Sequence, residues 1–322
     1  RARRNGVSLQ DRVLGEPQLL GRMTAGPLAR VANFVHESRL VRRTMQAAAG
    51  IAADFPLPPF GETSFARWLA RHTPLPEAGR RGTVALFATC LADYNFPRIA
   101  ASAVRVLEKN GWIVTRPEQT CCGMPNLDGG DVEAARRKVR ENVSSLAREL
   151  ELGRKVVCLQ PTCAYMMKKE WPGLDGSEQA RRVAAAAVDA MELLEGQRRD
   201  KSLARDFVKG LGRVAYHASC HLRAQKIGYP AARVLGAIPD TDVEIVEQCS
   251  AVDGTWGMKA QHYEQGRRYA QKLMRGIEAV EPAVVVTDCA LSGRRILAEN
   301  ERAALHPIEA LAEAYGVAPE VR

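Results

Sequence analysis

The feature that most constrains the fold of this 322-residue chain is an internal duplication. The run 84–90 (Val-Ala-Leu-Phe-Ala-Thr-Cys) returns at 214–220 (Val-Ala-Tyr-His-Ala-Ser-Cys) with four identical positions. Cysteines recur at nearly the same spacing: 130, 127 and 126 residues separate Cys90 from Cys220, Cys122 from Cys249 and Cys163 from Cys289. A repeat of this length that includes the cysteines indicates two copies of one supersecondary unit.

Each copy alternates short apolar runs with amphipathic helical patterns. Strands are expected at 84–89, 112–115, 156–160, 214–219, 243–246 and 284–288. Runs this short and continuously apolar are typical of strands buried on both faces. The pattern predicts an α/β fold of two pseudo-symmetric repeats, with parallel sheets and flanking helices.

A different composition precedes the first repeat. Residues 1–60 have apolar positions at helical spacing with arginines between them, and the run 56–59 (Pro-Leu-Pro-Pro) indicates an extended linker. We therefore expect a helical N-terminal segment and linker at 1–80, the first cysteine-rich repeat at 81–200 and the second at 201–322.

The cysteines follow the predicted strands. In open parallel sheets, ligands bind in the crevice at the carboxyl ends of the strands, so loops that follow different strands reach one site. The first repeat brings four thiols to this edge from three loops: Cys90, Cys121, Cys122 and Cys163. All-sulfur coordination suits an iron–sulfur cluster or zinc, and the long gaps between these cysteines favour a [4Fe-4S] cluster.

The second repeat has three cysteines at the matching positions, namely Cys220, Cys249 and Cys289. Where the first repeat has Cys-Cys-Gly, the second has Cys249 followed by Ser and Ala. The residues that could supply a fourth ligand are His221, Asp253, His217 and Ser250. The site could hold a 3Fe-4S cluster, a 4Fe-4S cluster with a non-cysteine or exogenous ligand, or no metal.

The loops around the cysteines also carry predictions. Residues 120–130 are rich in Gly and Pro, which is typical of a loop whose backbone approaches a bulky inorganic group. The cofactor-contacting loop positions are expected at Gly123, Pro161 and Gly254. Cys158 lies inside a predicted strand and is expected to be a buried free thiol. We assign no catalytic residue.

Charge and composition limit the partners and the compartment. Eight cysteines without a secretory signal indicate a reducing, cytoplasmic location, and no stretch approaches the ~20 apolar residues of a transmembrane helix. Residues 1–50 hold nine of the arginines and three acidic residues, within a net charge of +9. This basic arm, residues 1–50, could bind an anionic membrane surface or an acidic partner. The same charges are also expected if the arm is an ordinary helix face exposed to solvent. Nucleic acid is not expected, because no aromatic and basic platform accompanies the charge.

These residues resemble the duplicated cysteine-rich "CCG" domain family. That family includes the B subunit of heterodisulfide reductase, the glycolate oxidase iron–sulfur subunit, lactate-utilisation proteins and the C subunit of anaerobic glycerol-3-phosphate dehydrogenase. The resemblance covers about residues 81–300 and is carried by three strings: 120–125 (Thr-Cys-Cys-Gly-Met-Pro), 161–163 (Pro-Thr-Cys) and 216–221 (Tyr-His-Ala-Ser-Cys-His). These strings are similar to those of the glycerol-3-phosphate dehydrogenase branch, in which two ferredoxin-type clusters precede this region. Since the chain lacks their cysteines and an initiator Met, we expect a C-terminal portion of such a subunit or a variant without the ferredoxin part.

The chain departs from the family pattern at three positions. The last motif, C-x-x-C in the family, ends here at Met166 and Ser292, and Ser250 replaces a cysteine. In heterodisulfide reductase, five cysteines per repeat are associated with fused clusters that cleave a disulfide, and neither repeat here has five. The resemblance therefore implies an electron-transfer subunit rather than that disulfide chemistry.

The expected function is electron transfer from a flavoprotein dehydrogenase subunit towards quinone or another carrier. Other ferredoxin-type subunits are possible partners, and the location is cytoplasmic or peripheral at the inner face of the cell membrane. Two alternatives stay open: a thiol–disulfide or persulfide reductase with an open-site cluster, and a zinc-stabilised interaction module. A dinucleotide cofactor is not expected, since no Gly-x-Gly-x-x-Gly follows a strand.

Overall fold

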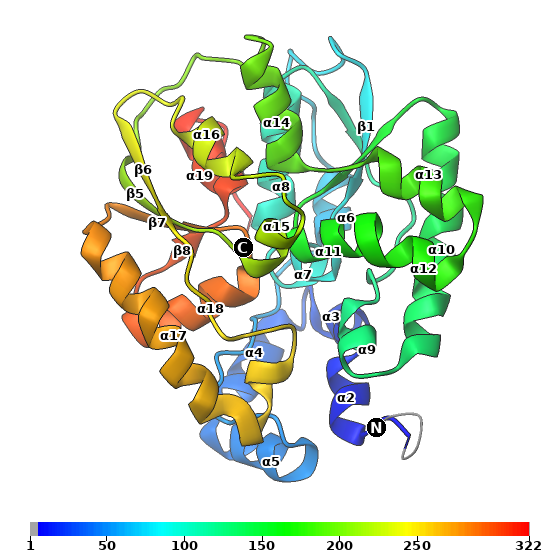
Figure 1. The fold of residues 1–322 in the computed structure, drawn as a ribbon, viewed down its shortest axis with the longest axis vertical. Helices are drawn as coiled ribbons and strands as arrows, with labels where there is room; N and C mark the ends of the chain where they lie inside the picture. The colour runs from blue at the N-terminus through cyan, green and yellow to red at the C-terminus, as the bar shows by residue number, and fades with distance from the viewer. Residues whose placement is uncertain (1–5, 322) are drawn as a thin grey trace.

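The structure is a computed structural model that describes residues 6–321, and it contains two four-stranded parallel sheets (Figure 1). Their strand orders are β2-β1-β3-β4 and β6-β5-β7-β8, which is one order used twice. This confirms the predicted α/β fold with two pseudo-symmetric repeats. The strands are β1 Thr83–Phe87, β2 Ile113–Thr115, β3 Lys155–Cys158, β4 Ala187–Asp189, β5 Gly212–His217, β6 Thr241–Val246, β7 Val284–Thr287 and β8 Ala304–Leu305.

Helices follow the strands and cover the sheets. Those of the first repeat are α7 Cys90–Tyr94, α8 Pro97–Lys109, α9 Met124–Asp128, α10 Val132–Glu151, α11 Pro161–Tyr165, the π-helix η1 Met166–Glu170, α12 Trp171–Asp175, α13 Glu178–Ala186 and α14 Ala190–Arg199. Those of the second repeat are α15 Cys220–Ala224, α16 Pro230–Leu235, the 3₁₀ helix η2 Trp256–Met258, α17 Ala260–Val280, α18 Ala290–Asn300 and α19 Pro307–Ala314.

The structure departs from the sequence-based expectation at two kinds of place. Residues 120–130 are not a loop throughout, because α9 begins directly after the Cys-Cys-Gly turn. The fourth strand of each sheet, β4 and β8, was not predicted. These strands have three and two residues, too few for a recognisable hydrophobic period, and their pairing with β3 and β7 depends on the rest of the sheet.

The core explains why the strand sequences are continuously apolar. Side chains alternate between the two faces of a strand, so Val84 and Leu86 point one way from β1 and Phe87 the other. Val84 and Leu86 belong to a core that also contains Val214 and Tyr216 of β5, so one hydrophobic layer joins the two repeats. Residues of α8 and α19 complete this shared layer, which positions the repeats relative to each other.

Within residues 6–80 the N-terminal segment forms five helices, as the helical pattern predicted: α2 Leu9–Leu14, α3 Pro17–Thr24, α4 Ala29–Glu37, α5 Arg39–Ala49 and α6 Phe65–Leu69. Helices α2 to α5 lie together at one end of the molecule, beneath both repeats in the view of Figure 1. Three arginines of the predicted basic arm, Arg1, Arg3 and Arg4, lie outside the described residues.

Candidate metal centre

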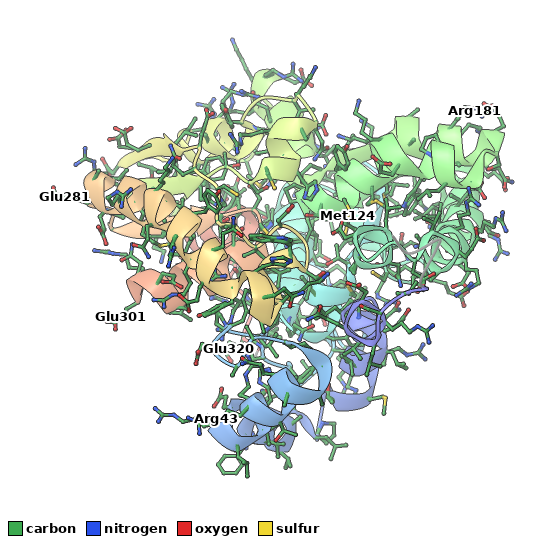
Figure 2. The ribbon with its side chains drawn as sticks, turned by 60° about the horizontal axis from the view of Figure 1, so that its bottom comes forward. Arg43, Met124, Arg181, Glu281, Glu301 and Glu320 are labelled. Carbon is green, nitrogen blue, oxygen red and sulfur yellow. The ribbon has the colours of Figure 1, made fainter. Side chains whose placement is uncertain are left out.

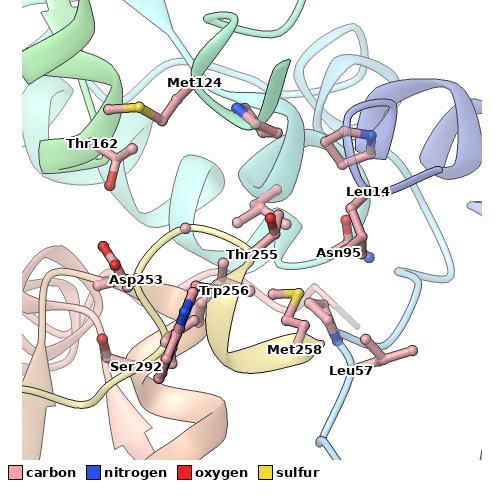
Figure 3. Close-up of a pocket in the computed structure, with 18 of the residues that line it drawn as sticks. Leu14, Leu57, Asn95, Met124, Thr162, Asp253, Thr255, Trp256, Met258 and Ser292 are labelled. Carbon is pink, nitrogen blue, oxygen red and sulfur yellow. The ribbon is translucent and has the colours of Figure 1, made fainter. Parts of the chain in front are cut away.

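The structure gathers the strand-end cysteines of both repeats around one cavity, which we call the chamber. It has a volume of about 980 Å³, and its walls come from both repeats and from the N-terminal helices (Figure 3). All seven cysteines proposed as ligands line it: Cys90, Cys121, Cys122, Cys163, Cys220, Cys249 and Cys289. Parallel strands explain this convergence, because the carboxyl ends of all strands in a sheet meet at one edge.

In the first repeat the thiols are packed against one another. Cys121, Cys122 and Cys163 are buried, and the Sγ atoms of Cys90 and Cys121 are 3.9 Å apart. Hydrogen bonds from Cys122 and Cys90 hold the pKa of Cys121 well below its usual value. Hydrogen bonds to neighbouring thiols, together with burial, raise the pKa values of Cys90 and Cys122. As free thiols, Cys90, Cys121 and Cys122 therefore favour a single thiolate, at Cys121.

This donor set fits a positively charged inorganic group that is bound by thiolates. Such a group allows several neighbouring thiols to ionise together, which burial and mutual repulsion otherwise prevent. Among residues 6–321, no group of three or more His, Cys, Asp or Glu side chains is close enough to hold a single metal ion. A cluster takes each thiolate on a different iron, so its ligands stand further apart than those of one ion.

The Cys121–Cys122 turn is held by side chains from three helices. Asn142 of α10 accepts from the amide of Thr120 at 2.9 Å and donates to the carbonyl of Cys121 at 3.1 Å. Gln18 of α3 accepts from the Cys121 amide at 2.7 Å. The Trp171 indole of α12 donates to the Cys122 carbonyl at 3.0 Å. These bonds fix the backbone that carries both thiols.

The sequence-based reasoning did not identify these three positioning residues. Asn142 had a usable signal, since it lies on the apolar face of α10 between Val139 and Val143 and is fully buried. A polar residue at a core position needs hydrogen-bond partners, and here it finds them in the turn. Gln18 and Trp171 carried no such signal, because their partners are 103 and 49 residues away in the chain.

The predicted loop positions have different surroundings. Gly254 lines the chamber with φ +59°, a left-handed backbone conformation that favours glycine, and a Cβ there would displace the carboxylate of Asp128 from the first repeat. Gly123 has φ +93° and faces Ala135 of α10, while Pro161 begins α11 and accepts from Gln225 at 3.2 Å. Neither Gly123 nor Pro161 is among the lining residues.

The second-repeat cysteines are more open. Cys220 and Cys249 are exposed, and Cys289 is half-buried. Partial burial of its thiol and the neighbouring thiols raise the pKa of Cys220 to about 11. The Ser250 and Ser292 hydroxyls, at the two positions where the family pattern has cysteine, are hydrogen-bonded to each other at 2.8 Å.

The candidates for a fourth ligand lie at the same wall. His221 and Asp253 both line the chamber, as do His217 and Ser250. The Nδ1 atom of His221 is 4.0 Å from Cys220 Sγ and 3.1 Å from Thr162 Oγ1 of the first repeat. His217 is buried between Thr287 and the carbonyl of Gln248, so both ring nitrogens already have partners.

Cys158 is separate from this site. It is fully buried in β3 with its Sγ 3.2 Å from the sulfur of Met167, and it does not line the chamber. This confirms that Cys158 is a buried thiol in a central strand. Met166, at the position of the missing first-repeat cysteine, is also fully buried.

Fold and site together define a duplicated α/β protein whose strand-end cysteines line one internal chamber. The chain belongs to the cysteine-rich domain family (CCG), whose profile matches residues 84–168 and 214–291. The two matched segments cover the first three strands of each sheet and their cysteine loops, whereas β4 and β8 lie outside them.

Comparison with characterised proteins places the chain within that family. It is 28% identical over 322 residues to the C subunit of anaerobic glycerol-3-phosphate dehydrogenase from Escherichia coli K12, covering 95% of this chain and 77% of the relative. It is 32% identical over 184 residues to lactate utilization protein A of an Exiguobacterium species, covering 55% and 74%. Lactate utilization protein A of Geobacillus thermodenitrificans is 30% identical over 145 residues, covering 43% and 57%.

Proposed function

We propose that this chain is an iron–sulfur electron-transfer subunit that accepts electrons from a flavoprotein dehydrogenase and passes them towards quinone or another carrier. One observation carries the proposal: two repeats of one fold bring seven strand-end cysteines to a single chamber. An iron–sulfur cluster supplies reversible transfer of one electron at a time when it is bound there.

The residues divide into two sites under this proposal. Cys90, Cys121, Cys122 and Cys163 would hold a [4Fe-4S] cluster, with Asn142 and its partners keeping the turn in place. Cys220, Cys249 and Cys289 would hold a second cluster, either 3Fe-4S or 4Fe-4S with His221 or Asp253 as the non-cysteine ligand. Both sites face one chamber, which supports electron passage between them.

Two arguments support a flavoprotein partner: the similarity to a dehydrogenase subunit and the electron chemistry of flavins. The chain matches 77% of the length of a relative named as one subunit of a dehydrogenase, which supports a role within a multi-subunit complex. A flavin gives up two electrons and can release them singly to a cluster, whereas a quinone takes two electrons and two protons to become quinol. A flavoprotein subunit, with or without further ferredoxin-type subunits, is therefore the donor we propose.

Metal analysis tests the proposal directly. The full chain, purified without oxygen, is expected to contain iron and labile sulfide and to give an EPR signal on reduction. Cys121→Ser is expected to lose most of the sulfide of the first site, whereas Cys158→Ala keeps the full content because Cys158 lies away from the chamber. Stoichiometric zinc without sulfide would instead establish the zinc-stabilised module and overturn the proposal.

The open wall of the second site favours a second candidate, a thiol–disulfide or persulfide reductase. Cys220 and Cys249 are exposed to the chamber, so a small sulfur compound could reach a cluster held there. This candidate requires an EPR signal that changes on adding a disulfide or persulfide and that no longer responds in Cys249→Ser. A signal indifferent to such compounds leaves electron transfer as the function.

We also infer peripheral binding to a membrane through helices α2 to α5. Of the fifteen exposed large apolar side chains among the described residues, nine lie between residues 9 and 40, including Phe34, which is 80% exposed. Apolar exposure on this scale indicates an interaction surface. Among residues 6–321, no helix is long and apolar enough to cross a bilayer.

The charges beside this surface complement an anionic bilayer. A second cavity, of about 480 Å³, borders α5 and is lined by Arg39, Arg42, Arg43 and Arg294, together with the acidic Glu37 and Asp54. Arg39 and Arg43 are exposed and available to headgroups, whereas Arg42 is buried and donates to backbone carbonyls. Arg43 extends from the N-terminal end of the molecule in Figure 2. Amphipathic helices with arginines beside exposed apolar side chains bind at the headgroup level of membranes.

Vesicle sedimentation tests the membrane surface. The full chain is expected to bind vesicles that contain phosphatidylglycerol more tightly than neutral phosphatidylcholine vesicles. Phe34→Glu places a charge in the apolar face and is expected to weaken binding at least tenfold. Leu152→Glu, which changes an exposed apolar residue just after α10, is the matched control and should bind as the unaltered chain does. Equal binding of the two variants would exclude this surface.

A further inference from the structure

The N-terminal helices carry two apolar faces, and their inner faces form the outer wall of the chamber. On α3, Pro17, Leu20 and Thr24 line the chamber, whereas Leu19 and Met23 are exposed on the other side. The spacing of three and four residues places each set on one side of the helix. The apolar exterior and the apolar chamber wall are therefore opposite sides of one helical layer.

Helix α4 repeats this arrangement. Ala32, Val35 and His36 line the chamber, and Val31 and Phe34 are exposed outside. On α5, Val41 and Met45 face the chamber and Leu40 faces out. A helical layer that packs on one side needs only one apolar face. A second apolar face indicates that the other side also contacts an apolar medium or ligand.

Two chamber-lining side chains of these helices are also half exposed. Leu20 of α3 and Val35 of α4 line the chamber and are 45% and 46% exposed, respectively. Protein therefore covers this part of the apolar wall only in part, on the same helices that carry the apolar exterior.

At its inner wall the chamber has hydrogen-bond donors without partners. Gln160 and Ser219 line the chamber and are only 5% and 4% exposed. The Nε2 atom of Gln160 and the Oγ atom of Ser219 have no hydrogen-bond partner among the described residues. The other end of the Gln160 amide accepts from the Ala290 amide at 3.4 Å, which leaves Nε2 available. Buried donors of this kind normally have an acceptor.

Each donor is close in sequence to a candidate metal ligand. Gln160 comes three residues before Cys163 of the first repeat, and Ser219 directly precedes Cys220 of the second. A ligand that accepts from both donors would therefore contact the inner wall near cysteines of both repeats. Its remaining length would lie along the apolar wall formed by α3, α4 and α5.

We propose that the chamber binds a lipid-soluble quinone, with a ring carbonyl oxygen at Gln160 and Ser219 and the apolar tail along α3, α4 and α5. This inference rests on the proposed electron-transfer function and names the carrier and its site. A quinone combines oxygen acceptors at one end with an apolar chain at the other, which is the polarity of this chamber. The chamber of about 980 Å³ would also hold the clusters at its cysteine wall, so the quinone would occupy the part between that wall and helices α3 to α5.

Binding of a short-tailed quinone to the loaded full chain tests this site. Titration calorimetry is expected to show one decylubiquinone per chain, and at least tenfold weaker binding of the tail-less ubiquinone-0. Met45→Trp fills the apolar wall and is expected to weaken decylubiquinone binding at least tenfold. Ser219→Ala removes one donor and is expected to weaken it about fivefold, the value of one hydrogen bond of ~1 kcal/mol.

The control separates the chamber from the exterior. Phe34→Glu lies on the outer face of α4 and should bind decylubiquinone as the unaltered chain does while losing vesicle binding. Met45→Trp should retain vesicle binding, and circular dichroism of both variants verifies their folding. Unchanged decylubiquinone binding by Met45→Trp, equal affinity for both quinones, or non-saturable uptake would each overturn the inference.

The same samples distinguish this inference from the proposed function. Iron and labile sulfide are measured on each preparation before titration. Clusters without saturable quinone binding would overturn the quinone site and leave electron transfer standing. Quinone binding by protein that contains no sulfide would overturn the electron-transfer proposal and leave the site standing.

Discussion

The two repeats share one strand order but differ in the surroundings of their cysteines. In the first, Cys121, Cys122 and Cys163 are buried, and the doublet is held by side chains from α3, α10 and α12. In the second, Cys220 and Cys249 are exposed, and a serine pair occupies the positions of the missing thiols. The comparison teaches that the sheet determines where a site lies, whereas the connecting loops determine its ligands and its access to solvent.

The largest expected effect comes from removing one ligand on each side. Cys121→Ser should abolish the first cluster, because it removes the thiol whose ionisation its neighbours favour. Cys249→Ser should remove only the second cluster and leave the EPR signal of the first. Iron and sulfide per chain, measured with EPR on both variants, check this. Equal losses in both variants would mean that the two sites do not bind clusters independently.

Adding a thiol at Ser250 should make the second cysteine site more like the first. Ser250→Cys supplies a fourth sulfur at the position that corresponds to the cysteine doublet, and it is expected to raise the occupancy and oxygen tolerance of the second cluster. Ser250→Ala, which also breaks the bond to Ser292 but adds no ligand, is the control. Mössbauer or EPR typing reports whether the second site becomes a four-cysteine cluster. An unchanged cluster type would argue that His221 or Asp253 already completes it.

Removing the clamp on the doublet should have a moderate effect. Asn142→Leu leaves buried backbone groups of Thr120 and Cys121 without partners, which costs on the order of 1–3 kcal/mol for each group. We expect a lower free energy of unfolding and a shifted reduction potential for the first cluster only. Val139→Leu on the same face of α10 changes packing without touching the turn. A potential that shifts equally in both variants would assign Asn142 a packing role.

The smallest expected effect concerns two matching helix caps. Asp189, the last residue of β4, and His306, which follows β8, each cap the next helix in a capping box with a glutamate three residues on, Glu192 and Glu309. Burial raises the pKa of Asp189 to about 7 and lowers the pKa of His306 to about 4. Between about pH 4 and 7 both caps are therefore buried mainly in their neutral forms, although their side chains ionise in opposite directions.

The two caps change the folding stability with pH in opposite directions. The unfolded state releases the Asp189 proton more readily, so this group lowers stability as pH rises from about 4 to 7. The unfolded state binds the His306 proton more readily, so this group lowers stability as pH falls from about 6.5 to 4. Asp189→Asn should flatten the decline towards neutral pH and His306→Asn the decline towards acid, each by about 1–3 kcal/mol in denaturant titrations. Parallel pH curves for the variants and the unaltered chain would contradict this.

Much of the fold could be predicted because its signals are local. The apolar runs of β1 and β5, the proline that begins α8 and the long amphipathic period of α10 each depend on adjacent residues. The cysteine loops could be placed at one edge, since parallel strands end together. The short strands β4 and β8 could not, because their pairing depends on neighbours distant in sequence.

The candidate site was predictable in its ligands and not in its surroundings. Sequence periodicity assigned seven cysteines to strand ends and identified Ser250 as the point of asymmetry. It could not show that Gly123 turns towards α10 while Gly254 lies in the chamber, because both are glycines after cysteine loops. Their roles differ through contacts with Ala135 and Asp128, which are made by folding.

The sequence by itself determined the duplication, the parallel α/β class and the positions of the cysteines along the chain. Each of these can be read along the chain, either from residue patterns within one strand or helix or from the return of the same pattern about 130 residues later. The tertiary structure alone decided that both repeats face one chamber and that helices α2 to α5 form its wall. The reason is that the shared core of Val84, Leu86, Val214 and Tyr216 orients the two sheets, and such long-range packing leaves no period in the sequence.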